Sequence, residues 1–147
     1  MELNATVTQR EQVSPDLIVL RVAPRGPLFA FEPGQYGVLG LPGSAPRAPM
    51  SGKEDAPPAG DKLVRRAYSI ASSSKAGEYL EFYIKLVRTG ELTPRLFSLK
   101  VGDSVWLGPK PAGHFTLDTV PPDKDLVMVA TGTGLAPYVS MIRTSHR

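Results

Sequence analysis

The 147-residue sequence contains no cysteine and only two histidines. Disulfide bonds and thiolate metal sites are therefore excluded, and a metal site built from imidazoles is not expected. No apolar run approaches the ~20 residues that a membrane-spanning helix needs. The first ten residues, MELNATVTQR, lack the basic and then apolar layout of a signal peptide. We therefore expect a cytoplasmic protein that holds no metal and has no membrane partner.

The sequence also lacks a large excess of one charge, since it contains 17 Lys and Arg residues and 14 Asp and Glu residues. The formal net charge of +3 is too small for the basic footprint of a nucleic-acid-binding protein, so no nucleic-acid partner is expected. Proline, in contrast, is abundant at 15 residues, about twice its usual share of ~5%. Proline in such numbers favours short strands and turns over long helices.

Short β-type runs separated by glycine and proline make up most of the first 120 residues. In residues 79–87, YLEFYIKLV, apolar and polar side chains alternate as in a strand with one buried face. Strands at this spacing are typical of a small antiparallel barrel or sandwich. Residues 42–62 contain five prolines and three glycines and are expected to form a mobile surface loop. The other expected strands are 17–22, 35–41, 65–72 and 104–108.

The pattern changes near residue 121. Residues 125–130, DLVMVA, are a continuous apolar run, which is typical of a strand in a parallel sheet. A glycine turn, TGTG, follows, and residues 135–143, LAPYVSMIR, are expected to form a helix. This is the first strand and helix of an α/β nucleotide-binding domain. A parallel strand needs a second strand beside it, so we expect this domain to be incomplete.

Residues 65–74, RRAYSIASSS, combine a cation, a phenol and hydroxyls within one expected strand. The Arg66 guanidinium can make two hydrogen bonds to a phosphate, and the Tyr68 ring offers a flat face to an aromatic ligand. The Ser69 hydroxyl can bond a heteroatom at the edge of that ligand, although strict alternation turns it to the opposite face. A dinucleotide fits these three groups. The alternative is structural: Tyr68 half-buried, Arg66 solvated and Ser69 in a turn.

Residues 90–103, GELTPRLFSLKVGD, contain a helix start. Thr93 can cap the helix with its hydroxyl, Pro94 suits the first helical position, and Gly102 is expected to end the helix. Gly90 permits a close approach of the backbone. Free N–H groups at such a start can bind an anion, whereas the alternative is that Thr93 only caps a connecting helix.

The order of the motifs resembles that of the bacterial ferredoxin (flavodoxin)–NADP⁺ reductases, within the ferredoxin reductase superfamily. The segments are PGQY, RAYS, EFYIKLV, GELTPRL, GDSVWLGP, GHFTL and ATGTGLAP. The resemblance implies an all-β, six-stranded antiparallel FAD-binding barrel with a capping helix in residues 1–120. Residues 121–147 are then the start of the NADP-binding α/β domain. It also implies hydride transfer between NADP(H) and FAD at flavin N5, and electron exchange between a monomer and ferredoxin or flavodoxin.

The resemblance also assigns roles to residues. Arg66 is expected to hold the FAD pyrophosphate, and Tyr68 and Ser69, as catalytic residues, to contact the isoalloxazine ring and the region of N5. The backbone of residues 91–93 is expected to bind the pyrophosphate, and residues 131–134 to border the nicotinamide. The complete expected cofactor-binding set is Arg66, Ala67, Tyr68, Ser69, Tyr83, Ile84, Lys85, Gly90, Glu91, Leu92, Thr93, Thr131, Gly132, Thr133 and Gly134.

Two other functions stay open. One is a reductase component that supplies electrons to an oxygenase; an accompanying iron–sulfur domain would discriminate it, and no cysteine here could belong to one. The other is a non-enzymatic β-barrel that binds oligonucleotides or a protein, in which basic and aromatic residues form a stripe. Here the cationic residues are scattered. Because we expect the second domain to be incomplete, we also expect this chain to bind FAD better than NADP⁺ and not to turn over NADPH alone.

Overall fold

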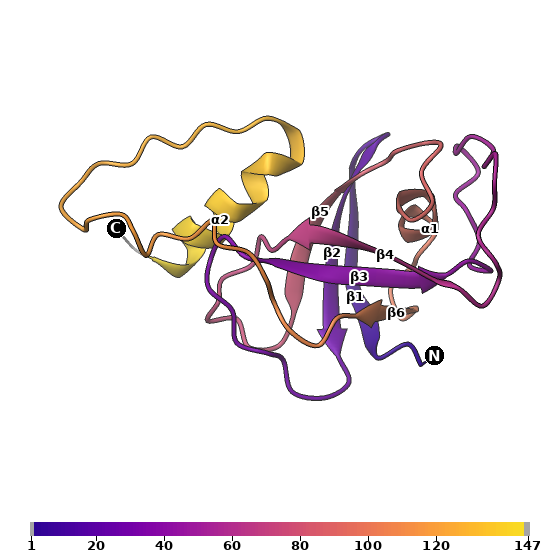
Figure 1. Ribbon diagram of the computed structural model, residues 1–147, viewed down its shortest axis with the longest axis horizontal. Helices are drawn as coiled ribbons and strands as arrows, with labels where there is room; N and C mark the ends of the chain where they lie inside the picture. Colours follow the sequence, from indigo (N-terminus) through magenta and orange to yellow (C-terminus); the bar gives the residue numbers. More distant parts are fainter. Residues whose placement is uncertain (1, 146–147) are drawn as a thin grey trace.

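The computed structural model describes residues 2–145, which form one antiparallel sheet, a short helix and a second helix near the C-terminus (Figure 1). Six strands make the sheet, in the order β4-β3-β6-β1-β2-β5. The predicted six-stranded antiparallel architecture is confirmed. The strands are β1 (Ala5–Ser14), β2 (Leu17–Pro24), β3 (Tyr36–Pro42), β4 (Leu63–Ser69), β5 (Leu80–Lys85) and β6 (Ser104–Leu107).

The sheet is curled, but regular strand pairing does not close it into the expected barrel. Strands β4 and β5 lie at the two ends of the strand order. Within residues 2–145 a single bridge, between Ile70 and Phe82, joins the end of β4 to β5, and the Ala71 amide adds one hydrogen bond of 2.8 Å to the Glu81 carbonyl. Pairing stops there because the chain turns away into the small polar residues 72–74.

One strand has no counterpart in the sequence-based prediction. Strand β1 pairs with β2 along most of its length and with β6 at its start. Only Ala5 and Val7 of its ten residues are buried, so the sequence lacks a sustained alternation. Two register shifts, between Val7 and Gln9 and between Gln12 and Ser14, disturb the pattern further.

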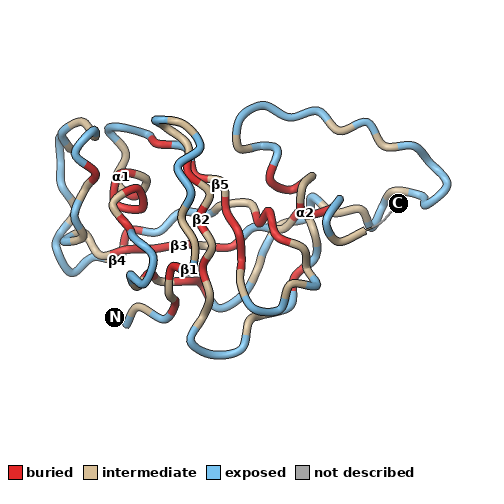
Figure 2. Tube along the Cα trace, turned by 180° about the vertical axis from the view of Figure 1, so that it is seen from behind, coloured by how far each residue is buried: buried red, intermediate tan, exposed pale blue. Residues whose placement is uncertain are grey.

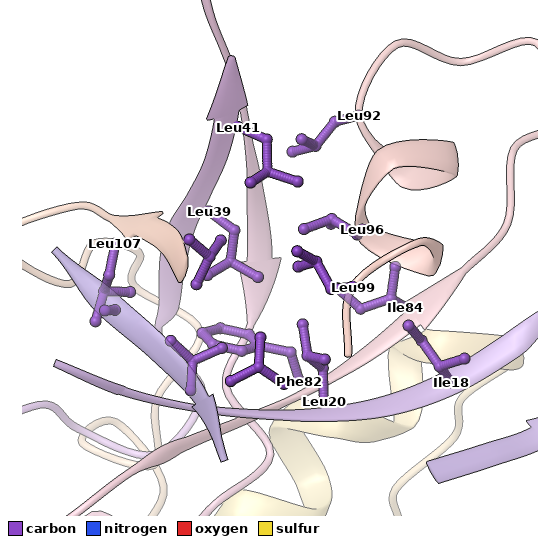
Figure 3. Close-up of a cluster of buried hydrophobic side chains, with 14 of the residues drawn as sticks. Ile18, Leu20, Leu39, Leu41, Phe82, Ile84, Leu92, Leu96, Leu99 and Leu107 are labelled. Carbon is purple, nitrogen blue, oxygen red and sulfur yellow. The ribbon is translucent and has the colours of Figure 1, made fainter. Parts of the chain in front are cut away.

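The core lies between the concave face of the sheet and α1 (Thr93–Phe97). Figure 3 shows Leu92 and Leu96 pointing from the helix segment toward Leu41 and Leu39 of β3, with Phe82 below them. Burial is concentrated along the strands and α1, whereas the long connection before α2 is mostly exposed (Figure 2). No helix in the described part of the chain is long and apolar enough to cross a membrane. No group of metal-ligating side chains was found in that part either.

The region after residue 117 contains the predicted helix but not the predicted strand. Helix α2 (Ala136–Thr144) follows a 3₁₀ turn, η1 (Gly132–Leu135). Residues 125–130 have no regular structure, and Val127 and Val129 are 90% and 77% exposed. The expected strand is absent because the described residues offer it no neighbouring strand to pair with. Figure 1 shows this segment as a long excursion away from the sheet.

The proline-rich residues 43–62 connect β3 to β4 as an irregular surface segment. The segment is not loose, because it is hydrogen-bonded to its surroundings at several points. The Ala48 amide donates to the Pro94 carbonyl at 2.9 Å, and the Gly52 amide donates to the Arg88 carbonyl at 2.9 Å. The expected mobile loop is therefore a segment anchored against α1 and the chain that precedes it.

Candidate functional site

A cleft of about 380 Å³ opens between β4, β5 and the segment that leads into α1. This cleft brings together two parts of the sequence that were predicted separately, the RAYS strand and the GELTP segment. Every lining residue except Val87 belongs to the predicted site. The lining residues are Arg66, Tyr68, Tyr83, Lys85, Val87, Gly90, Glu91, Leu92, Thr93 and Thr133.

Strand β4 supplies Arg66 and Tyr68, which line the cleft together because they stand two residues apart on one face of the strand. The Arg66 side chain donates one hydrogen bond, from Nη1 to the neighbouring Arg65 carbonyl at 2.7 Å. Arg66 forms no ion pair with a carboxylate in residues 2–145, so its guanidinium is available to an anion. Burial raises the pKa of the Tyr68 phenol to about 12, an effect that the charge of Arg66 partly opposes. Tyr68 is therefore neutral at physiological pH.

The segment between β5 and α1 forms the opposite wall. Gly90 makes a tight turn here, with its amide donating to the Val87 carbonyl at 2.9 Å, and a Cβ at Gly90 would lie only 3.1 Å from that carbonyl oxygen. The Thr93 hydroxyl accepts from the Val87 amide at 2.8 Å and donates to the Val87 carbonyl at 3.2 Å. These contacts hold the two ends of residues 87–93 together.

The predicted cap of α1 is wrong in its details. Leu92 occupies the N-cap position and no side chain caps the helix, because the Thr93 hydroxyl is already engaged with Val87. The helix also ends at Phe97 and not at Gly102. Gly102 instead has a φ of +96° in the turn before β6. Pro94 does occupy the first turn, as predicted.

The resulting wall carries free backbone donors. The N–H groups of Glu91, Leu92 and Thr93 donate to no protein acceptor in the described part of the chain. Across the cleft stand the cationic side chains of Arg66 and Lys85. Residues with free backbone N–H groups and a guanidinium in the lining of one cleft suit the oxygens of a phosphate or diphosphate. The two tyrosine rings in the lining add flat apolar surface beside that anion site.

Several predicted residues lie outside this cleft. Ala67 lies in a second hollow, on the other face of β4, and Ser69 pairs with Tyr36 at the end of that strand. Ile84 is fully buried in the core, so only its backbone could reach a ligand. The glycine turn contributes Thr133 to the lining, whereas Thr131, Gly132 and Gly134 are exposed around η1.

Val87 was missed because a valine at the end of an alternating run carries no chemical signal. Two arginines behind the cleft wall were missed as well, one in the proline-rich segment and one in α1. Arg47 and Arg95 reach the outer side of the cleft wall and donate to the carbonyls of Gly90 and Glu91. Arg47 lies 43 residues from Gly90, and Arg95 lies 41 residues from Glu54, with which it is also hydrogen-bonded, so no local motif could have identified them.

Comparison with known proteins supports a flavin site. Residues 55–117 match the family model described as an oxidoreductase FAD-binding domain. The ferredoxin–NADP reductase of Azotobacter vinelandii is 40% identical over 119 residues, which are 81% of this chain and 40% of that protein. The chain thus spans less than half the length of this curated relative.

Two solved structures share the fold of this chain. A ferredoxin NADP⁺ reductase from Neisseria gonorrhoeae with bound FAD and NADP superposes with a TM-score of 0.79 and 25% identity, over 97% of this chain and 51% of that one. An Amycolatopsis cytochrome P450 reductase superposes with a TM-score of 0.68 and 34% identity, over 96% of this chain and 38% of that one. These similar proteins are reductases, in agreement with the family that the order of motifs in the sequence predicted.

Proposed function

We propose that this chain, a member of the ferredoxin/flavodoxin–NADP reductase family, forms the FAD-binding part of an enzyme that exchanges electrons between NADP(H) and a ferredoxin or flavodoxin. One observation carries the proposal. Arg66 and the free amides of residues 91–93 line the same cleft, which also contains Tyr68 and Tyr83. The groups present therefore fit both the diphosphate and an aromatic ring of a flavin dinucleotide.

The proposal divides the chain into two parts. Residues 1–120 form the FAD-binding domain, in which bound FAD and the Ile70–Phe82 bridge together complete a barrel. Residues 121–147 begin the domain that binds NADP(H), and Thr133 is the point where this second part reaches the flavin cleft. The protein acts as a cytoplasmic monomer, with no nucleic-acid or membrane partner.

A bound FAD would supply the redox chemistry, exchanging hydride with NADP(H) and single electrons with the protein partner. Arg66 holds the diphosphate through its guanidinium, and the amides of residues 91–93 bind it from the other wall. Tyr68 packs a neutral ring beside the flavin and excludes water from it. The Ser69 hydroxyl, at the end of β4 beyond this cleft, would orient the edge of a bound flavin ring.

The direct test is to purify the 147-residue chain and titrate it with FAD. We expect a yellow protein with flavin absorbance and quenched flavin fluorescence. A colourless protein with no measurable FAD affinity would overturn the proposal and favour a binding module that uses the same sheet for another purpose.

A second candidate function is favoured by the likeness to the Amycolatopsis cytochrome P450 reductase. In that case the flavin site is the same and the electron acceptor is an oxygenase system. Assays of NADPH-dependent electron transfer separate the two. Rapid NADPH-dependent reduction of a ferredoxin or flavodoxin supports the first function, and reduction of an oxygenase component alone supports the second.

A further inference from the structure

Three charged side chains pack behind the wall of the flavin cleft, two from the proline-rich segment and one from α1. We call this group, Arg47, Glu54 and Arg95, the anchor cluster. Glu54 accepts two hydrogen bonds from the Arg95 guanidinium, of 2.8 and 3.1 Å, and lies 3.5 Å from Arg47. The side chains of Glu54 and Arg95 are only 7% and 4% exposed. Such burial is uncommon for charged residues and requires that they be paired and hydrogen-bonded.

Each arginine also donates a hydrogen bond to the cleft wall, and Arg95 donates two more to the carbonyls of Gly43 and Ala45 in the proline-rich segment. Arg47 donates to the Gly90 carbonyl at 2.7 Å, and Arg95 donates to the Glu91 carbonyl at 2.6 Å. Arg47 also bonds the carbonyls of Gly52 and Arg88, at 2.7 and 2.9 Å. The cluster therefore ties the proline-rich segment to the turn that precedes α1.

These carbonyls belong to the same peptide units as two of the free amides. The Gly90 carbonyl shares a peptide plane with the Glu91 N–H, and the Glu91 carbonyl shares one with the Leu92 N–H. The described backbone contains no cis peptide, so the N–H and C=O of each unit point in opposite directions. When the arginines hold the carbonyls from outside, the two N–H groups are directed away from the cluster, toward the cleft.

A charged donor on a carbonyl has an electronic effect as well. Hydrogen bonds in a chain polarise one another, so a guanidinium on the carbonyl strengthens the N–H of that peptide unit as a donor. Glu54 keeps both arginines in place, and its hydrogen bonds with Arg95 hold the pKa of its carboxyl below the usual value. The cluster is thus charged and assembled at neutral pH.

We propose that the anchor cluster is a positioning device for the cofactor: Glu54 orients Arg47 and Arg95, and these orient the amides of Glu91 and Leu92 for binding the FAD diphosphate. The inference rests on the proposed function, and it deepens that function by giving the proline-rich segment a role in cofactor affinity. The cluster itself does not touch the flavin cleft, so its members are positioning residues and not ligands.

The test compares Glu54→Gln with Asp55→Asn in the 147-residue chain. Both variants replace one carboxylate by an amide in the same segment, but Asp55 is exposed and forms no ion pair among the described residues. Glu54→Gln should weaken FAD binding about tenfold, which is the low end of the ~10–100-fold loss caused at metal sites by removing a group that orients a ligand. Asp55→Asn should bind FAD as the parent chain does. Arg47→Lys keeps the charge but loses the two-pronged hydrogen-bonding geometry of the guanidinium. Its FAD affinity should lie between those of the other two variants.

A second readout separates positioning from simple loss of stability. Titrations well below the thermal midpoint of each variant should show the loss with FAD and not with riboflavin, which lacks the diphosphate. The amide resonances of Glu91 and Leu92 should shift on addition of FAD in the parent chain and shift less in Glu54→Gln. Equal FAD affinity in Glu54→Gln and the parent, or an equal loss with riboflavin, would overturn the inference. Failure of the parent chain to bind FAD would instead overturn the proposed function.

Discussion

Arg143 on α2 donates a hydrogen bond to the carboxylate of Glu81 in β5. The other oxygen of that carboxylate accepts from Arg21 in β2 at 2.9 Å, so one buried acid joins the helix to two strands of the sheet. The Ser140 hydroxyl reinforces the junction by donating to the Ser72 carbonyl at 2.7 Å. Polar contacts at specific positions therefore join helix α2 to the sheet.

We expect Glu81→Gln to lower the free energy of unfolding by about 2 kcal/mol. Removing one partner of a fully buried ion pair costs about 3–5 kcal/mol, and the partial exposure of both arginines reduces this loss. Urea denaturation measures the change, with Glu78→Gln as the control because Glu78 is exposed and unpaired among residues 2–145. Equal stability of the two variants would show that Glu81 does not hold α2.

The role of Arg66 is tested by substitution. Arg66→Ala should weaken FAD binding by about 2 kcal/mol, or roughly 30-fold, because a charged hydrogen-bonding group is lost from the diphosphate. Arg66→Lys should restore the affinity only in part, since an ammonium cannot make the two parallel hydrogen bonds that a planar guanidinium makes to a phosphate. Arg65→Ala is the matched control from the opposite face of β4. Unchanged FAD affinity in both Arg66 variants would remove this residue from the site.

Tyr68 should give the chain a measurable alkaline transition. The folded-state pKa is raised from 10.0 to about 12, so the folded state holds the phenolic proton more tightly than the unfolded state does. The corresponding stability is present below pH 10 and is lost as the pH rises through 12. Tyr68→Phe should remove the highest phenolate transition from an absorbance titration and make stability less dependent on pH in this window. A parent transition near 10 for Tyr68 would contradict its burial.

The chain should discriminate strongly between its two expected nucleotides. We expect FAD to bind much more tightly than NADP⁺, because the flavin cleft is assembled whereas residues 125–130 form no strand. Isothermal titration with each nucleotide checks this expectation. Tight NADP⁺ binding, comparable with that of FAD, would mean that residues 121–147 already make a nucleotide site.

The sequence predicted the sheet where local patterning is strong. Residues 79–87 alternate cleanly, and β5 follows them with Phe82 and Ile84 buried. The sequence could not predict β1, because most of the strand after Val7 is polar. It also could not show that residues 125–130 have no regular structure. An apolar run has the composition of a strand, but it becomes a strand only when a neighbour supplies hydrogen bonds.

In the candidate site, too, residues of a local motif could be predicted, whereas contacts between residues far apart in the sequence could not. Arg66 and Tyr68 could be selected because their chemistry and spacing are visible in four consecutive residues. The hydroxyl of Thr93 was assigned to the helix cap, whereas it bonds Val87 six residues earlier. Arg47 and Glu54 were assigned to a mobile loop, because nothing local shows that Arg95 lies beside them. Contacts of this kind depend on the fold.

The exposed residues 125–130 also affect how the protein behaves at high concentration. Val127 and Val129 present apolar surface on a backbone that has unused hydrogen-bonding groups, which makes the segment a template for edge-to-edge pairing with another copy. Aggregation through this segment should therefore rise steeply with concentration, and light scattering can follow it. The substitution Val127→Lys should reduce this aggregation, because a charge opposes edge-to-edge pairing, and it should leave FAD binding unchanged.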